Sequence, residues 1–283
     1  MKIMSLNVNR FSGREDRDYT NLITSLDKCP KANEIIAFIK GFLCGDSDNM
    51  VFLPEVPYWK GEVRDRGFRW TEERRLYQNF CCGFPMKQYE ISSPRRKAYS
   101  CTLAIWNKKG GWGPENYVLG SSDNLRQKTN YANKYIELKG HNLRLMGIHA
   151  PDDYQFLEDI KKYAEEHRNE KLIILGDFNI ATNKWRKDKY DEQMRRGEKE
   201  EECKNFKKRR DWLLETMPDI DFSDAIDGET PTYFWREKGE QKGTTVDHVL
   251  ISDKLKGKVV AQVIPQEILE LSDHAVIIVD IRE

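Results

Sequence analysis

Five short apolar runs, spread along the whole chain, each end in a cluster of polar residues, and this pattern constrains the fold more than any other. The clusters are Ser5-Leu6-Asn7-Val8-Asn9, Leu53-Pro54-Glu55, Ile148-His149-Ala150-Pro151, Gly176-Asp177-Phe178-Asn179 and Ser272-Asp273-His274. A short apolar run bounded by turn residues is typical of a buried strand. Because α/β proteins gather polar groups where strands leave a sheet, we expect the clusters to meet at one edge.

The length of 283 residues is within reach of one large two-sheet α/β sandwich, and without a low-complexity spacer we predict a single domain over residues 1–283. Hydrophobic residues make up 39% and charged residues 33%, which excludes a disordered chain and predicts a heavily charged surface. Lys plus Arg equals Asp plus Glu at 47 each, so any affinity for nucleic acid has to come from local basic patches.

Targeting signals are not evident. The N-terminus has neither the apolar stretch nor the small-residue cleavage site of a signal peptide, and no run approaches the length of a membrane span. The six cysteines are scattered without a CxxC pair, which argues against a zinc site and a disulfide framework. We therefore expect a cytoplasmic location, and the sequence leaves the oligomeric state open.

Hydrophobic periodicity predicts an opening of strand, helix and strand, over residues 2–8, 35–43 and 50–56. Residues 58–94 have no sustained period and are expected to form irregular surface. Further strands are predicted over 99–106, 131–138, 143–149, 171–175, 245–251, 258–264 and 275–281, with a helix near 156–163 and a hairpin whose turn Gly140 supplies. The almost wholly charged residues 184–210 predict an exposed helix or ordered insertion.

Glu55 is the best candidate for a metal ligand, because hard cations such as Mg²⁺ take carboxylate oxygens and leave other positions to water and substrate phosphate. Asn7 and Asn9 are placed to support a ligand or a phosphate oxygen. The plainer alternatives are an exposed carboxylate at a strand end and asparagines that begin a turn.

Two further clusters carry groups for proton transfer. The glycine of Gly176-Asp177-Phe178-Asn179 lets the chain turn so that Asp177 and Asn179 face one cleft, where Asp177 can accept a proton from attacking water. Asp247 lies inside an apolar run, where an ionised carboxylate needs a partner, and we predict that His274 is this partner. A polar turn is the alternative for each cluster alone.

The two histidines would have different roles. A carboxylate that holds His274 favours its imidazolium form, which can neutralise charge on a phosphate under attack. His149 is then available to protonate a leaving oxygen, and Asp273 can reach the metal or its waters. His141, His167 and His248 are interpreted as structural or surface histidines.

In this order, from Asn7 to His274, the motifs resemble the endonuclease/exonuclease/phosphatase superfamily, which includes deoxyribonuclease I-like nucleases, AP endonucleases, neutral sphingomyelinases and inositol polyphosphate 5-phosphatases. The resemblance implies an α/β (α+β) four-layer sandwich, with two packed mixed β-sheets flanked by helices and the site at one end. It also implies a divalent cofactor, Mg²⁺, for which Mn²⁺ can substitute.

The resemblance assigns roles that agree with those drawn from the residues. It implies that Glu55 is the principal metal ligand, with Asn7 in support and Asp273 near the metal. It makes Asp177 the residue that orients or deprotonates water, with Asn179 beside it. Asp247 and His274 become the hydrogen-bonded pair at the phosphate, and His149 the phosphate-contacting or leaving-group histidine of the deoxyribonuclease I-like branch.

The sequence departs from the superfamily pattern near the site. Exonuclease III-type AP endonucleases typically carry tyrosine where this chain has His149, so a specialist for abasic sites is less expected. Pro54-Glu55-Val56 replaces the more usual Gln-Glu pair, and Thr245-Val246-Asp247 lacks a basic residue often found two positions before the aspartate. These differences lie at positions where subfamilies with different substrates diverge. They leave every proposed catalytic group in place but make the substrate harder to assign.

Substrate contacts are predicted in three places. Arg95, Arg96 and Lys97 lie in a loop that contains Ser and Pro, and several arginines between residues 64 and 75 alternate with aromatic residues. Trp235 is expected to wall the cleft, although aromatic strand residues are more often core. The basic run 207–210 is better explained as a solvated helix face.

The leading hypothesis is a Mg²⁺-dependent phosphodiesterase that hydrolyses nucleic acid, a deoxyribonuclease I-like endonuclease. The alternative is a phosphoesterase for a small or lipid head-group substrate, such as a phosphoinositide or sphingomyelin. A third possibility is a binding protein that kept the fold and lost the chemistry. The presence of every proposed catalytic group counts against the third.

Overall fold

A computed structural model describes residues 1–11, 30–57, 60–64, 67–71, 74–92, 100–115, 119, 131, 133–264 and 271–282. For Arg10, Pro30 and residues 60–64, 67–71 and 74–76, only the backbone is described. Two six-stranded sheets form the centre of the molecule. In the described part of the chain, no helix is long and apolar enough to cross a membrane.

The first sheet combines strands from both ends of the chain. Its strands, in spatial order, are β15 (Val259–Ile264), β16 (Val276–Ile281), β1 (Lys2–Ser5), β2 (Met50–Pro57), β6 (Ser100–Asn107) and β5 (Tyr89–Ile91). β1 is parallel to β2 and antiparallel to β16, so the sheet is mixed. The first and last strands of the chain are therefore neighbours.

The second sheet is built from the C-terminal part of the chain. Its strands, in spatial order, are β11 (Phe222–Asp224), β14 (Asp247–Ser252), β10 (Lys171–Asp177), β9 (Leu143–His149), β8 (Tyr135–Gly140) and β7 (Gly113–Pro114). β9 and β10 are parallel and the other neighbours are antiparallel. This sheet is also mixed.

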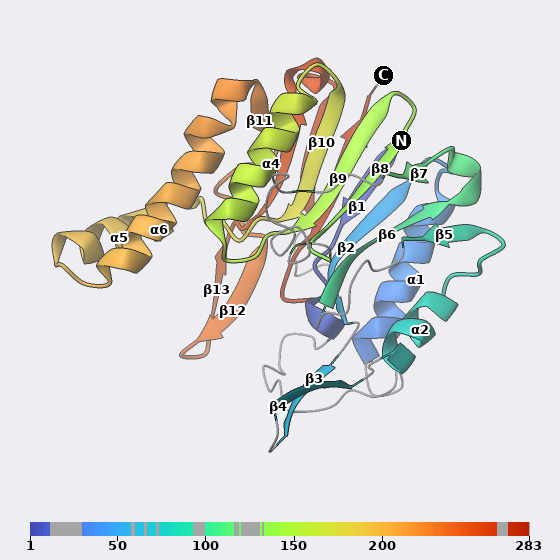
Figure 1. The fold of residues 1–283 in the computed structure, drawn as a ribbon, viewed down its shortest axis with the longest axis horizontal. Helices are drawn as coiled ribbons and strands as arrows, with labels where there is room; N and C mark the ends of the chain where they lie inside the picture. Colours follow the sequence, from blue (N-terminus) through green and yellow to red (C-terminus); the bar gives the residue numbers. More distant parts are fainter. Residues whose placement is uncertain are drawn as a thin grey trace.

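Helices cover the outer face of each sheet, which gives the predicted four layers (Figure 1). The helices α1 (Pro30–Cys44) and α2 (Arg74–Cys82) lie on the first sheet, and α4 (Tyr154–Glu166) and α6 (Glu200–Asp211) lie on the second. The helix α5 (Lys184–Arg195) projects from the second sheet with α6, and the hairpins β12 (Tyr233–Glu237) with β13 (Glu240–Thr244) and β3 (Lys60–Arg64) with β4 (Gly67–Thr71) extend from the sandwich. Short helical turns are Asn9–Phe11, Lys108–Gly110, Trp212–Thr216, Pro218–Ile220 and Asp253–Leu255.

Three apolar layers hold this arrangement together. The central layer joins the facing sides of the sheets and includes Met50 and Phe52 from one sheet with Leu145 and Ile173 from the other. The outer layers pack the amphipathic helices onto each sheet, for example through Ile39 of α1. Burial on both faces explains why the strands are near-continuous apolar runs in the sequence.

The sheets approach closely where Phe52 of β2 meets Gly147 of β9. A Cβ atom added to Gly147 would lie 2.1 Å from Cδ1 of Phe52, so only glycine fits here. Glu55 follows Phe52 by three residues, and His149 follows Gly147 by two. This contact therefore sets the separation of the sheets beside two of the predicted site residues.

The structure corrects two sequence predictions. Residues 58–94 were expected to be irregular, but they contain β3, β4, α2 and β5. The hairpin between β8 and β9 turns at His141 and Asn142, whose φ angles are 50° and 55°, and not at Gly140. Gly140 is instead required by packing, because an added Cβ would lie 2.8 Å from the Gly111 carbonyl oxygen and from Cε3 of Trp112.

Candidate active site

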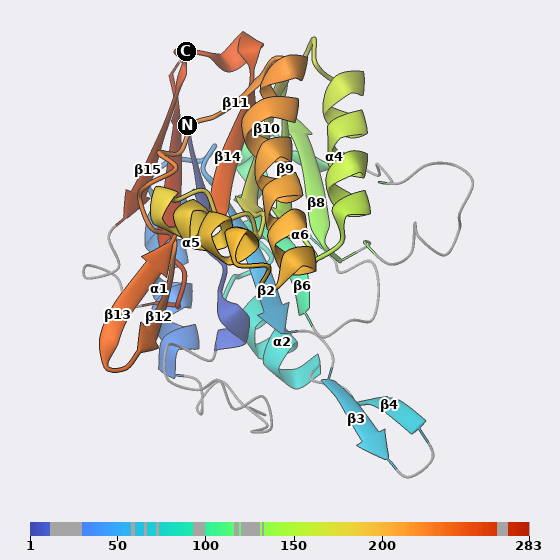
Figure 2. The same ribbon diagram turned by 90° about the vertical axis from the view of Figure 1, so that its left-hand side faces the viewer.

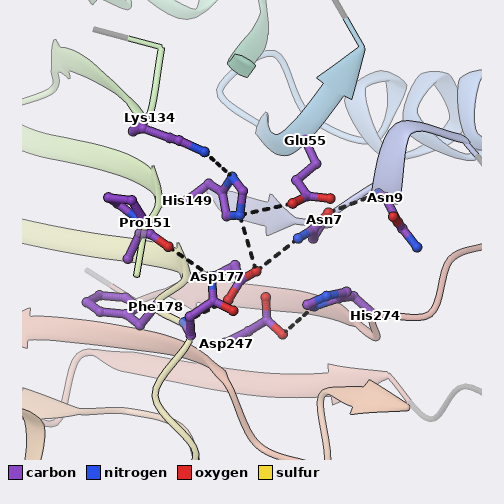
Figure 3. Close-up of polar contacts among 12 residues, drawn as sticks. Asn7, Asn9, Glu55, Lys134, His149, Pro151, Asp177, Phe178, Asp247 and His274 are labelled. Carbon is purple, nitrogen blue, oxygen red and sulfur yellow. Dashed lines mark hydrogen bonds and ion pairs between the residues drawn. The ribbon is translucent and has the colours of Figure 1, made fainter. Parts of the chain in front are cut away.

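The five polar clusters meet at one end of the sandwich, as their positions after apolar runs predicted (Figure 3). In the second sheet, Asp177 is paired in register with His149 of β9 and with Asp247 of β14, so these side chains form a row across three strands. From the first sheet, the ladder continues beyond β1 through the Leu6 N–H to the Phe52 carbonyl and the Val8 N–H to the Pro54 carbonyl, both at 3.1 Å. The site is thus built from both sheets.

Glu55 lies at a β-bulge, where the register of β2 against β6 shifts between Leu53 and Val56. Its φ angle is 58°, a left-handed conformation that costs about 1–3 kcal/mol in a residue other than glycine. Bulges redirect side chains next to active sites. Here the apolar neighbours stay buried while the Glu55 carboxylate reaches the cleft.

His149 connects the two sheets. Its Nε2 lies 3.0 Å from Oε1 of Glu55 and 3.9 Å from Oδ2 of Asp177, while Nζ of Lys134 lies 3.3 Å from its Nδ1 (Figure 3). Burial would raise the pKa of Glu55, but the hydrogen bond and charge of His149, with further positive charge nearby, lower it to about 2. Burial lowers the pKa of Lys134. Glu55 is therefore ionised throughout the neutral range.

Asp177 is held from two directions. Oδ2 accepts a hydrogen bond of 3.0 Å from Nδ2 of Asn7, and Oδ1 accepts one of 2.8 Å from the Asn179 N–H. Asn179 has a φ angle of 54°, and its Nδ2 donates to the Ala150 carbonyl at 2.8 Å. Burial, with the charge of Asp247, raises the pKa of Asp177. The carboxylate is thus oriented and more basic than an ordinary aspartate.

The predicted partnership of Asp247 with His274 is confirmed. Nδ1 of His274 donates to Oδ2 of Asp247 at 2.9 Å, and both side chains are buried. Burial would lower the pKa of His274, but the charge of Asp247 and this hydrogen bond raise it to about 10. The imidazole therefore carries a positive charge at neutral pH.

Asn9 and Asp273 close the remaining side of the cluster. Nδ2 of Asn9 donates to Oδ2 of Asp273 at 2.8 Å, and the Asn9 N–H donates to Oδ1 of Asn7 at 2.9 Å. Ser272 Oγ donates to Oδ1 of Asp273 at 3.2 Å, and burial raises the pKa of this carboxyl. Both asparagines therefore order the site as well as offer amide oxygens.

The charge balance fits a hard cation. Four carboxylates converge here, and burial raises the pKa of two of them, Asp177 and Asp273, as expected where negative charge is incompletely compensated. Glu55, Asn7 and Asp273 offer the oxygen atoms that Mg²⁺ prefers. Ligand atoms of Asp177, Asp247 and His274 also lie within 4.8 Å of one another. A ring nitrogen suits Mg²⁺ poorly, so we interpret that triad as a hydrogen-bonding unit.

Comparison with known proteins supports the resemblance drawn from the motifs. Residues 143–278 match a family model described as "Endonuclease-reverse transcriptase". The whole chain superposes on the 3'-5' exonuclease NExo from Neisseria meningitidis with a TM-score of 0.61 at 16% identity, covering 100% of both chains. The family model covers slightly less than half of the chain and the solved structure shows a shared fold, so both are consistent with a resemblance to the endonuclease/exonuclease/phosphatase superfamily. The predicted resemblance is confirmed.

Two AP endonucleases have a similar fold. One from Archaeoglobus fulgidus gives a TM-score of 0.60 at 16% identity and covers 99% of each chain. LMAP from Leishmania major gives 0.63 at 15% identity, covering 100% of this chain and 87% of the other. The comparison with curated proteins gives no match. At these identities the structural comparisons establish the fold alone.

The candidate site brings together all but three of the predicted residues. The cleft has a volume of about 1300 Å³ and is lined by Asn7, Asn9, Glu55, His149, Asp177, Asn179, Trp235, Asp273 and His274. Asp247 lies beside His274 and is joined to it by a hydrogen bond (Figure 3). Arg95, Arg96 and Lys97 lie outside the described residues, as do the side chains of the arginines between 64 and 75. His248 is structural as predicted, with Nδ1 2.6 Å from Asp224 Oδ2.

Three features of the site were not predicted from the sequence. Lys134 precedes β8 and contacts His149, but a lone lysine before a strand gives no sequence signal. One wall of the cleft comes from α5, within the segment interpreted only as charged. Arg209 was expected on a solvated face but is buried. The helical spacing of Cys203, Phe206 and Leu213 could have placed it on the inner face.

Arg209 fixes the loops that follow β9 and β10. Its Nη2 donates to the Phe178 carbonyl at 3.0 Å, and its Nη1 lies 3.3 Å from both the Pro151 carbonyl and Oδ1 of Asp152. These loops begin at His149 and Asp177. Arg209 of α6 thus positions two site residues from behind and does not itself line the cleft.

Proposed function

We propose that this protein is a phosphodiesterase that hydrolyses phosphodiester bonds of nucleic acid, with Mg²⁺ as cofactor and Mn²⁺ able to substitute. The observation that carries this proposal is the convergence of Glu55, His149, Asp177 and the Asp247–His274 pair on the floor of one cleft. An ionised carboxylate, a raised-pKa carboxylate and a charged imidazole together suit the attack of water on a phosphate ester.

Asp177 is the proposed base. Its pKa is raised by burial, which brings it nearer to the working pH and so improves proton transfer. The hydrogen bond from Asn7 and the Asn179 N–H fix both oxygens, so that the carboxylate can orient one water molecule. Asn179 holds the loop through the Ala150 carbonyl.

The positive groups neutralise the charge that develops on the phosphate. His274, with a pKa of about 10, is an imidazolium at neutral pH and remains close to Asp177. His149 and Lys134 supply a second polar group and a cation on the opposite side of Asp177, beside Glu55. His149 is the proposed donor to the leaving oxygen.

Glu55, Asn7 and Asp273 are the proposed residues that hold the metal. A bound divalent cation would polarise the phosphate and offset the negative charge of the transition state. The low pKa of Glu55, about 2, keeps its carboxylate available as a ligand across the neutral range. Asn9 orders both supporting ligands by hydrogen bonds to Asn7 and Asp273.

The dimensions of the cleft favour a polymer over a head group. Pockets for small ligands usually enclose about 300–1000 Å³, whereas this cleft has a volume of about 1300 Å³ and extends along α5 and the β12–β13 hairpin. The family model is described by the word endonuclease, which supports internal cutting of nucleic acid. A structure of NExo is described as bound to a product DNA hairpin. A phosphoinositide or sphingomyelin substrate is therefore not favoured.

The test is a Mg²⁺ and Mn²⁺ titration of the protein against supercoiled plasmid, single-stranded DNA, RNA, phosphoinositides and sphingomyelin. We expect metal-dependent nicking or shortening of nucleic acid that falls steeply with salt, as expected when several phosphates are bound. Glu55→Gln, Asp177→Asn and His274→Ala should each lower the rate at least about a hundredfold. Lys187→Ala, on a surface away from the cleft, is the matched control.

Three results would contradict the proposal. Phosphate or head-group release with no cutting of nucleic acid would identify the small-substrate alternative. Less than about a threefold loss in Asp177→Asn, with the far-ultraviolet spectrum unchanged, would remove the proposed base. Binding of nucleic acid without metal-dependent cutting would indicate a binding protein that has lost the chemistry.

A further inference from the structure

The cleft continues well beyond the catalytic groups. One side is the N-terminal part of α5, and the other is the hairpin of β12 and β13, which lies below α5 in Figure 2. Trp185, Arg186, Lys189 and Tyr190 of α5 line the cleft, as do Tyr233 and Trp235 of β12. The mechanism proposed above uses none of these side chains.

The rings on these two elements form a continuous series that starts at the catalytic imidazole. Tyr233 lies 5.0 Å from the His274 ring, and Tyr233 and Trp235 are stacked at 5.7 Å with an interplanar angle of 24°. Trp185 of α5 lies 6.2 Å from Trp235, with an angle of 39°. Trp185 is 42% exposed, so it offers ring surface to the cleft. We call Tyr233, Trp235 and Trp185 the aromatic wall.

A cation stands against this wall. The guanidinium of Arg186 lies 5.5 Å from the Trp185 ring, 5.8 Å from Trp235 and 5.6 Å from Tyr190. This position lets one planar cation contact rings and still face a ligand in the cleft. Half-exposed Arg186 and exposed Lys189 therefore place positive charge directly above the aromatic wall.

The charges on α5 and α6 differ between the cleft and the rest of the surface. Five cations outside the cleft are paired with nearby carboxylates, in Lys187–Asp191, Arg196–Glu192, Lys199–Glu202, Lys204–Glu200 and Lys207–Asp211, while Arg195 and Arg210 donate to backbone carbonyls and Lys208 lies over the Tyr154 ring. Within the described residues, neither Arg186 nor Lys189 has a carboxylate within 4.0 Å. Uncompensated positive charge beside exposed rings fits a ligand that carries both anionic groups and flat apolar faces.

We propose that the aromatic wall stacks the bases of an unpaired nucleotide segment next to the scissile phosphate, while Arg186 and Lys189 contact its phosphates. This inference rests on the proposed function and names the substrate class, nucleic acid that is single-stranded at the cleft. Bases in a duplex have their faces covered by neighbours, so only unpaired bases can stack on protein rings.

The first test is binding in EDTA, where no metal-dependent cutting occurs. Fluorescein-labelled oligothymidylate, oligouridylate and a duplex, each about 12 nucleotides long, are titrated with the protein. We expect tighter binding of the single strands, with quenching of tryptophan fluorescence. Trp185→Ala should weaken their binding by at least about fivefold, the lower bound for loss of one stacking contact, whereas Trp185→Phe should retain it.

Matched variants separate stacking from charge. Arg186→Ala should weaken single-strand binding and reduce its salt dependence, and Lys187→Ala, on the same helix, should leave both unchanged. Arg186→Ala leaves every ring of the aromatic wall in place, so it keeps the inference testable if Trp185→Ala fails to fold. The oligothymidylate and oligouridylate titrations distinguish DNA from RNA.

The outcomes for the two proposals differ. Equal affinity for duplex and single strand, or binding by Trp185→Ala within twofold of the parental protein, overturns the aromatic wall even if the protein cuts nucleic acid. Trp185-dependent binding without metal-dependent cutting overturns the nuclease and leaves the aromatic wall standing. No binding to any of the oligonucleotides overturns both.

Discussion

Asp247 and His274, 27 residues apart in sequence, form a buried pair whose Oδ2 and Nδ1 atoms are 2.9 Å apart. The carboxylate raises the pKa of the imidazole from an ordinary 6.5 to about 10, against the effect of burial. The pair therefore determines over which pH range a positive charge stands beside Asp177.

Replacing the Asp247 carboxylate should shift the pH range over which His274 is positively charged. In Asp247→Asn, the His274 ring stays buried but loses the negative charge of the Asp247 carboxylate beside it. Its pKa should therefore fall to or below the ordinary value. For Asp247→Asn we expect at least about a hundredfold lower activity near pH 8 and a partial recovery on acidification. In the parental protein, His274 should lose its positive charge, and the rate should fall, only near pH 10. A pH–rate profile of both proteins measures this. Identical profiles would show that the pair does not control the charge.

The free energy of unfolding should also depend on pH through the ionisation of His274. Because the folded pKa of His274 is raised, its contribution is present in full below about pH 6.5 and is lost as pH rises toward 10. Urea unfolding should show a free energy of unfolding that declines more steeply over this range in the parental protein than in Asp247→Asn. Asp253→Asn, an exposed carboxylate, is the control and should keep the parental slope.

Gly147→Ala tests the close contact between the sheets. The new Cβ would lie 2.1 Å from Cδ1 of Phe52, and relief requires the sheets to separate or the ring to move. We expect the free energy of unfolding to fall by about 1–3 kcal/mol and activity to fall with it, because Glu55 and His149 follow these residues. Gly41→Ala meets no atom within 4 Å, so this helical control should be neutral or stabilising.

Arg209→Met should separate positioning from chemistry. The variant keeps much of the apolar stem but loses the donors to the Phe178 and Pro151 carbonyls, which hold the loops after Asp177 and His149. We expect a loss of about 2 kcal/mol in stability and a decrease in kcat larger than any change in KM. Lys207→Met, an exposed member of the same helix, is the control. Unchanged kcat in a folded Arg209→Met protein would contradict the positioning role.

Metal removal provides a test independent of catalysis. If Glu55, Asn7 and Asp273 hold Mg²⁺, adding metal to the EDTA-treated protein should raise the free energy of unfolding by about 2.7 kcal/mol at a hundred times the Kd. Glu55→Gln should lose most of this increment, and Glu34→Gln, which alters an exposed carboxylate on α1, should retain it. The measurement is thermal unfolding across a Mg²⁺ series, and an equal shift in both variants would exclude Glu55 as a ligand.

The sequence predicted the floor of the site because its residues follow buried strands, whose apolar runs are visible without a structure. Asp177 and Asp247 are examples, and each was placed correctly at a strand that the periodicity identified. The walls could not be predicted in this way. β12 is half-buried, and its side chains do not alternate clearly between buried and exposed. The side chains of α5 form a cleft wall only because the β12–β13 hairpin lies opposite them.

Conformation at single residues was also hidden from the sequence. The positive φ of Glu55 depends on a bulge against β6, a partner about 45 residues further along the chain. The turn at His141 and Asn142 displaced the expected role of Gly140, because Trp112 needs the space that a side chain at Gly140 would fill. Such features arise from tertiary contacts, which local propensity does not report.

The position of β1 between β16 and β2 has a consequence for biosynthesis. During translation, β1 is made long before its neighbour β16, and His274 is absent until residue 274 has been added. A nascent chain therefore cannot assemble the catalytic floor, and a transcript truncated before residue 274 would yield a protein without that imidazole.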